Sequence, residues 1–156
     1  IIRPQDGVGG TIAALRLLPP LDEGAVRVAL LLAIIMAADT AAFFVGHQWG
    51  RRPLAPEVSP HKTVEGALGG LLGGVAGALV VRALGMPELP ALHAVGLGMA
   101  VAALGTLGDL AESLLKRWAG VKDSGTLFPG HGGMLDRLDS LLFGAPVLYY
   151  YFEYVR

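Results

Sequence analysis

The sequence contains no cysteine and few charged residues. Without a thiol, the chain can hold neither a disulfide framework nor a thiolate metal site, and it has no cysteine nucleophile. Charged residues make up 16% of the chain, below the quarter that is typical of soluble domains, and the formal net charge is −1. A near-neutral chain lacks the basic footprint that nucleic-acid binding requires, so we expect no nucleic-acid partner.

Apolar residues and glycine are abundant in this chain. Hydrophobic residues account for 53% of the chain, and 23 residues are glycine. Four apolar segments are each near the roughly 20 residues that a helix needs to cross a bilayer. They cover approximately residues 25–46, 66–84, 89–115 and 138–155. We therefore predict an all-α integral membrane protein with about four transmembrane helices, in which residues 1–156 form one membrane-embedded domain.

The basic residues predict the orientation of these helices. With four spans, the loops at 46–65 and 118–136 lie on the same side of the membrane. These loops and their edges hold most of the basic residues: Arg51, Arg52, Lys62, Lys116, Arg117, Lys122 and Arg137. Because positive charge is enriched on the cytoplasmic side, we predict a protein of the inner, cytoplasmic membrane with both loops facing the cytoplasm.

Glycines recur along one face of the second apolar segment. Six of them follow small-xxx-small spacing: Gly66, Gly69, Gly70, Gly73, Gly74 and Gly77. Such spacing lets membrane helices pack closely, within one protomer or between two. We favour packing within the protomer, with a homodimer interface as the alternative.

A dense group of polar residues lies between the last two apolar segments. Residues 113–139 hold basic side chains, carboxylates and His131 around a glycine-rich turn. Charge at this density beside a bilayer is costly unless a polar ligand occupies the site. A polyphosphate with its divalent metal fits this mixture. The turn is not a Walker A loop, because no Gly-Lys-Ser/Thr follows it.

Three carboxylates lie just before this group or at its C-terminal end. Asp109 ends an apolar run, so it is either a metal ligand or half of an ion pair with Lys116 or a neighbouring helix. Asp136 and Asp139 share a face if the last segment is helical where it begins. Asp139 suits a helix cap, which leaves Asp136 as the better metal ligand.

The first polar loop offers a second set of candidates. Ser59 or Thr63 can cap the helix that follows. Lys62 either contacts lipid headgroups or reaches a phosphate in a site shared with the second loop, and its spacing does not separate the two. His47 and His93 have no ligand-like partner at helical spacing, so we assign them no role.

Together, these motifs resemble the hallmark of phosphatidate cytidylyltransferases, also called CDP-diacylglycerol synthases. The matching elements are Ser113, Lys116-Arg117, Lys122-Asp123, Pro129-Gly130-His131-Gly132-Gly133 and Asp136-Arg137-Leu138-Asp139. The resemblance extends upstream through Gly108-Asp109, through residues 59–66 and to Asp39-Thr40, and so covers roughly residues 35–140. Phe43 stands where the family often has tyrosine.

The resemblance implies that phosphatidate attacks the α-phosphorus of CTP, giving CDP-diacylglycerol and pyrophosphate. It implies Mg²⁺, with or without a monovalent cation, held by Asp109 and Asp136. The other expected catalytic residues are Lys116, Arg117, Lys122, Asp123, His131, Arg137 and Asp139. The expected substrate-binding residues are Ser59, Lys62, Thr63, Glu65, Ser113, Lys116, Arg117, Gly132 and Gly133. Since family members carry additional N-terminal spans, we expect this chain to be the C-terminal, catalytic part of a longer architecture.

Three rival functions use the same features differently. In an ion-coupled transporter, Asp39, Asp109 and Glu112 would form a relay through the membrane. A non-catalytic scaffold would assemble through the glycine-rich segment. A membrane lipid or polyprenol kinase would also use a nucleoside triphosphate and Mg²⁺, but it would release a nucleoside diphosphate rather than pyrophosphate.

Overall fold

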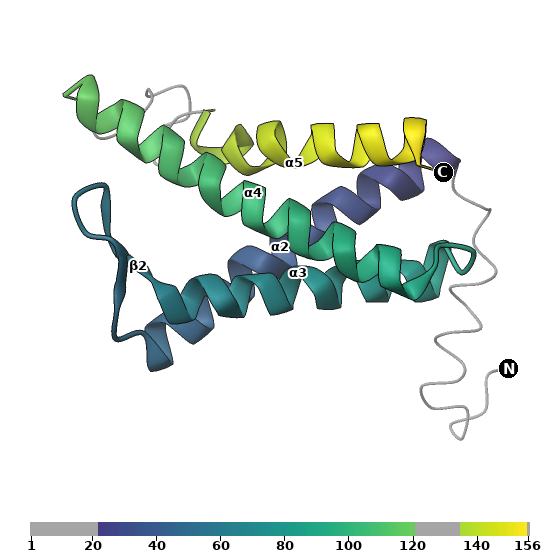
Figure 1. The fold of residues 1–156 in the computed structure, drawn as a ribbon, viewed down its shortest axis with the longest axis horizontal. Coiled ribbons are helices and arrows are strands. Elements are labelled where there is room, and N and C mark those ends of the chain that lie inside the picture. Colours follow the sequence, from purple (N-terminus) through teal and green to yellow (C-terminus); the bar gives the residue numbers. More distant parts are fainter. Residues whose placement is uncertain (1–21, 121–134, 156) are drawn as a thin grey trace, which may run out of the picture.

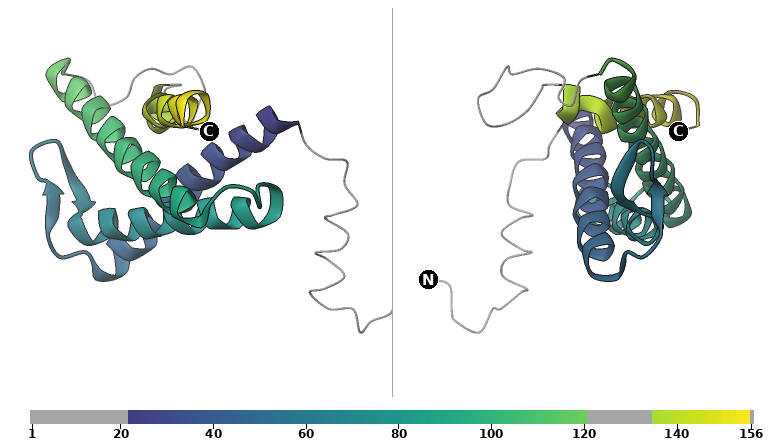
Figure 2. Two further views of the ribbon diagram at one scale, coloured as in Figure 1. Left: turned by 45° about the vertical axis from the view of Figure 1, so that its right-hand side comes forward. Right: turned by 90° about the vertical axis from the view of Figure 1, so that its left-hand side faces the viewer.

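The computed structural model describes residues 22–120 and 135–155, with the backbone alone described for residues 135–139. Its elements in chain order are α2 (Glu23–Trp49), β1 (Pro53–Ala55), β2 (Ser59–Thr63), α3 (Val64–Gly85), α4 (Ala91–Trp118) and α5 (Leu135–Tyr154). Helices α2 and α3 lie against each other, α4 packs on α3, and α5 packs on α4 (Figures 1 and 2). The predicted all-α membrane architecture is confirmed, with a small hairpin added between α2 and α3.

Three helices in the described part of the chain are long and apolar enough to cross a membrane: α2, α3 and α4. Helix α5 forms where the fourth span was expected, but it is not among these three. It contains Pro146, and it starts in the charged segment that precedes the apolar stretch. Whether α5 spans the bilayer therefore stays a prediction.

The glycine face of α3 packs inside the protomer, as favoured from the sequence. A Cβ atom added at Gly73 or Gly77 would lie 2.5 Å from a backbone carbonyl oxygen of α2, at Ala37 or Ala33 respectively. On another side of α3, a Cβ at Gly74 would lie 2.7 Å from the Cβ of Ala102 in α4. Glycine is required here because any side chain would push the helix backbones apart.

The hairpin between α2 and α3 was not predicted from the sequence, which indicated only a turn entering a helix. Strands β1 and β2 pair antiparallel, with Ala55 opposite Ser59. Each strand contains a proline, which cannot donate to a ladder and so argues against a strand. Just before β1, the backbone N–H groups of Arg51 (3.1 Å) and Arg52 (3.2 Å) donate to Oε2 of Glu65, which connects the entry of the hairpin to the first turn of α3.

The hydrophobic core lies at the end of the molecule away from the hairpin. Its fully buried large side chains are Leu30, Ile34, Leu89 and Val101, and Leu148 of α5 joins them. These residues come from the first half of α2, the α3–α4 turn, the first half of α4 and the second half of α5. The hairpin end is therefore free of the apolar core and can hold a polar cavity.

Candidate functional site

A cavity of about 650 Å³ lies at the hairpin end, among α2, the hairpin, α4 and α5. Helix α2 contributes Asp39, Ala42, Phe43, Gly46 and His47, and the hairpin contributes Leu54, Ser59, His61, Lys62 and Thr63. Ala67 of α3, Gly105, Thr106 and Asp109 of α4, and Ser140 of α5 complete the lining. This volume lies within the range of pockets that hold small organic ligands.

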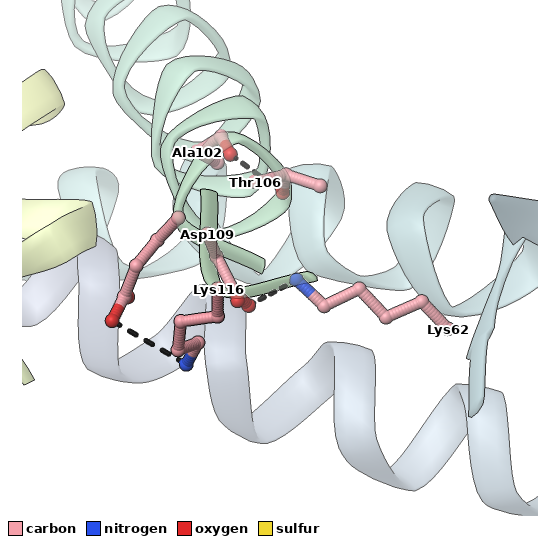
Figure 3. Close-up of polar contacts among 6 residues, drawn as sticks. Lys62, Ala102, Thr106, Asp109 and Lys116 are labelled. Carbon is pink, nitrogen blue, oxygen red and sulfur yellow. Dashed lines mark hydrogen bonds and ion pairs between the residues drawn. The ribbon is translucent and has the colours of Figure 1, made fainter. Parts of the chain in front are cut away.

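An ion pair between Lys62 and Asp109 spans this cavity (Figure 3). Lys62 is the penultimate residue of β2 and directly precedes Thr63, the N-cap of α3, and Asp109 lies two-thirds of the way along α4. The two residues are 47 positions apart in the chain. The pair holds an ammonium group and a carboxylate inside one pocket, which is the charge pattern needed to bind a phosphate beside a cation.

The partner of Lys116 is Glu112 rather than Asp109. Lys116 Nζ lies 3.4 Å from Glu112 Oε1, one helical turn back along α4 (Figure 3). The Glu112 side chain is almost completely buried, so the carboxylate is removed from water and kept close to a positive charge. Asp109 pairs with Lys62 of the hairpin, which is neither of the partners considered from the sequence, Lys116 or a neighbouring helix.

Small residues bring α4 and α5 together at the cavity. A Cβ added at Gly105 would lie 3.5 Å from the Cβ of Ser140, so the two helices approach closely where both line the pocket. The hydroxyl of Thr106 donates to the carbonyl oxygen of Ala102 at 2.9 Å, so this hydrogen bond stays within α4. Ser140, in the first half of α5, thereby lies beside α4 at the pocket.

The structure brings four of the predicted site residues to the cavity: Ser59, Lys62, Thr63 and Asp109. Thr63 is also the N-cap of α3, where its Oγ1 accepts from the N–H of Gly66 at 3.1 Å, as predicted. Glu65 does not line the pocket but holds the hairpin. Arg117 donates from Nε to the carbonyl oxygen of Val58 at 3.5 Å, and so connects the end of α4 to the hairpin turn.

Other predicted residues lie outside the pocket lining or outside the described residues. Ser113, Lys116 and Arg117 follow Asp109 along α4 but do not line the cavity. Lys122, Asp123, His131, Gly132 and Gly133 lie outside the described residues. Asp136, Arg137 and Asp139 belong to the beginning of α5, where only the backbone is described.

Three lining residues with aromatic or imidazole rings were not among the predicted site residues: Phe43, His47 and His61. Asp39 also lines the pocket, although only the rival transporter relay gave it a role. Asp39, Phe43 and His47 are spaced at i, i+4 and i+8, so they form one stripe along α2. That spacing could have identified the stripe from the sequence. It was overlooked because its three side chains, a carboxylate, a phenyl ring and an imidazole, differ in chemistry. His93 bonds to Tyr151 at 2.6 Å near the other end of the bundle, in keeping with having no role in the site.

The described residues are compatible with a divalent cation whose other ligands come from a phosphate and water. Within the described residues, no three Asp, Glu or His side chains lie close enough together to hold a metal ion alone. Magnesium usually needs only one or two protein carboxylates, with substrate phosphates and water completing its shell. Asp109 supplies one such carboxylate inside the cavity.

Known proteins share this architecture and sequence. The profile of the cytidylyltransferase family matches residues 7–155. The chain is 44% identical over 117 residues to a phosphatidate cytidylyltransferase of Bacillus subtilis, covering 75% of this chain and 44% of that protein. It is 48% identical over 127 residues to a phosphatidate cytidylyltransferase of Helicobacter pylori, covering 80% of this chain and 46% of that protein. The chain thus spans a little under half the length of these curated relatives.

A solved structure supports the same grouping. An intramembrane enzyme for archaeal membrane lipid biosynthesis superposes with a TM-score of 0.57 at 26% sequence identity. The match covers 78% of this chain and 75% of that one. An uncharacterized protein of Escherichia coli, YnbB, is 44% identical over 134 residues, covering 86% of this chain and 45% of that protein. With a family profile matched over nearly its whole length, the chain belongs to the cytidylyltransferase family.

Proposed function

We propose that this chain carries the catalytic part of a phosphatidate cytidylyltransferase, which converts CTP and phosphatidate to CDP-diacylglycerol and pyrophosphate. The observation that carries the proposal is the Lys62–Asp109 pair inside a membrane-helix cavity of about 650 Å³. Its support comes from the family membership and from relatives that are named for this activity. A cavity at the end of apolar helices suits a reaction between a water-soluble nucleotide and a membrane lipid.

The chemistry requires charge neutralisation more than a covalent intermediate. A phosphate oxygen of phosphatidate forms a bond to the α-phosphorus of CTP, while the bond from that phosphorus to the pyrophosphate oxygen breaks. Both reactants are anions, so positive groups that bind the phosphates lower the barrier. Lys62 supplies such a charge from the hairpin, and Asp109 keeps its ammonium group within the cavity.

Mg²⁺ is part of the proposal, with Asp109 and Asp136 as its protein ligands. Asp136 precedes the cavity-lining Ser140 by four residues, which is about one turn of α5. When bound, the ion would neutralise phosphate oxygens and polarise the phosphorus under attack. Asp109 lines the cavity and pairs with Lys62, so a metal bound to this carboxylate would lie beside the positive charge that binds phosphates.

The cytoplasmic location of the site is also a proposal. Arg51 and Arg52 precede the hairpin, Lys62 lies on it, and Arg117 of α4 contacts it, so these basic residues gather at the cavity end of the helices. The positive-inside rule favours the cytoplasm for that end. The glycine face that would serve a homodimer packs within the protomer, so it gives a dimer no support.

The experiment that tests the function measures products from CTP and phosphatidate with the protein in detergent. We expect pyrophosphate and CDP-diacylglycerol to form in equal amounts, and turnover to fall at least a hundredfold in Asp109→Asn and Asp136→Asn. Glu23→Gln is the matched control, because this carboxylate lies at the opposite end of α2 in an ion pair with Arg27. Release of a nucleoside diphosphate would instead indicate a lipid kinase. Wild-type turnover in both Asp variants would show that these carboxylates do not hold the metal.

A further inference from the structure

Two rings of α2 lie parallel to each other where this helix lines the cavity. Phe43 and His47 lie with their ring centroids 6.0 Å apart and their planes 5° from parallel. They are one helical turn apart, and both line the cavity. We call this pair the ring ledge. None of the proposed chemistry of phosphates and metal uses it.

The ring ledge is poorly covered by the protein itself. Phe43 is 66% exposed, although it lines a pocket that also contains Lys62 and Asp109. An exposed aromatic face among charged groups gains free energy when a flat partner covers it. The neighbouring Phe44 meets the edge of Phe43 in a T-shaped contact and does not line the cavity. The two adjacent phenylalanines therefore face different surroundings, and only Phe43 can meet a ligand in the pocket.

We propose that the ring ledge is the subsite for the nucleobase, so that the base of the nucleoside triphosphate stacks on the exposed ring of Phe43, alongside the parallel ring of His47. This rests on the proposed function. The cavity divides into two chemistries: Lys62 provides the positive charge for phosphates, and α2 provides parallel aromatic rings for a base. Every nucleobase has a π-face, and aromatic side chains are the usual platforms for it. His47 adds ring nitrogens that can hydrogen-bond to the edge of the base.

A lipid chain is the competing occupant of an exposed phenylalanine in a membrane protein. The binding free energy of a lipid chain would be the same with any apolar side chain of similar size, because the hydrophobic effect has no directional requirement. A stacked base instead requires a ring. Replacing the ring with an apolar side chain of similar size therefore distinguishes a bound base from a lipid chain.

The test compares two probes, CTP and inorganic tripolyphosphate, in equilibrium binding to the detergent-solubilised protein with Mg²⁺. Base–aromatic stacking corresponds to roughly a 5- to 150-fold loss of affinity when the ring is removed. We expect Phe43→Leu to weaken CTP binding within that range and to leave tripolyphosphate binding unchanged. Phe43→Tyr should bind CTP like the wild type, because it keeps the ring.

Two further variants keep the test decisive. Phe44→Leu is the matched control, and we expect it to bind both probes like the wild type. His47→Leu removes the other ring and should give the same selective loss, so the proposal does not depend on the folding of one variant. An equal loss for both probes, or no loss for either, in Phe43→Leu and His47→Leu would overturn the ring ledge as the base subsite.

Failure of the proposed function gives a different result. If the wild-type protein binds neither CTP nor tripolyphosphate and forms no CDP-diacylglycerol, the function itself is wrong. If the wild type makes CDP-diacylglycerol and the ring variants keep full CTP affinity, only the base subsite is wrong.

Discussion

Loss of the Lys62–Asp109 pair should separate the hairpin from α4 at a measurable cost. The pair is the direct ionic link between the hairpin and the cavity face of α4. We expect Lys62→Met and Asp109→Asn each to lower the free energy of unfolding, and the double variant to cost less than the sum of the two. The difference between the sum and the double variant is the coupling energy of the pair.

The expected coupling follows from how far water reaches the two side chains. Lys62 and Asp109 are 27% and 41% exposed, whereas the pair Arg27–Glu23 at the other end of α2 is 43% and 89% exposed. Exposed pairs at helical spacing contribute about 0.3–0.5 kcal/mol. Lower exposure reduces screening and strengthens the attraction, while removal from water costs part of that gain. We therefore expect a coupling of about 1–2 kcal/mol for Lys62–Asp109.

The assay is unfolding by sodium dodecyl sulfate titration in mixed micelles, followed by circular dichroism. The control is the same cycle with Arg27→Met and Glu23→Gln, for which we expect about 0.3–0.5 kcal/mol. A Lys62–Asp109 coupling no larger than that of the control would refute the reasoning, because the pair would then not bridge the hairpin and α4 in the folded protein.

Two more predictions concern the scaffold of the site. Gly77→Ala places a Cβ 2.5 Å from the carbonyl oxygen of Ala33, so it should destabilise the protein by about 1–3 kcal/mol. Gly96→Ala meets nothing within 4 Å and should be neutral or stabilising by up to about 1 kcal/mol; equal effects in the same unfolding assay would contradict the close packing of α2 and α3. Thr63→Ala removes the cap of α3 and should cost about 1 kcal/mol, with Thr63→Ser restoring most of it. Comparing the KM for CTP in these two variants tests whether Thr63 also contacts substrate, since a cap alone would leave KM unchanged.

Local features of the site could be predicted because each depends on residues that are close in the chain. Thr63 caps α3 through a hydrogen bond that spans three positions. The spacing of Glu112 and Lys116 is one helical turn, so their ion pair could have been predicted, although Lys116 was considered only as a partner of Asp109. The glycines of α3 indicated close helix packing before the partner helix was known. In each case the relevant geometry is one or two helical turns, which sequence spacing describes directly.

Other features could not be predicted, because they depend on which helix faces meet. Nothing in the spacing chose between lipid headgroups and a phosphate of a shared site for Lys62, and its partner in the structure, Asp109, is 47 positions away in the chain. His47 had no partner at helical spacing that suited a metal, and it gained a place in the pocket only because α2 turns that stripe toward the hairpin and α4. The prolines of the hairpin argued against strands, and its entry is held by hydrogen bonds to Glu65, which is more than ten positions away in the chain.

The sequence by itself determined that this chain is a bundle of apolar helices with a charged segment of the cytidylyltransferase family, because hydropathy and motif spacing are properties of continuous stretches of chain. Only the tertiary structure decided that the cavity combines a stripe of α2, a strand of the hairpin and the face of α4 around Asp109. The physical reason is the close contact of glycine faces, which sets how α2, α3 and α4 are rotated and therefore which polar side chains share one space.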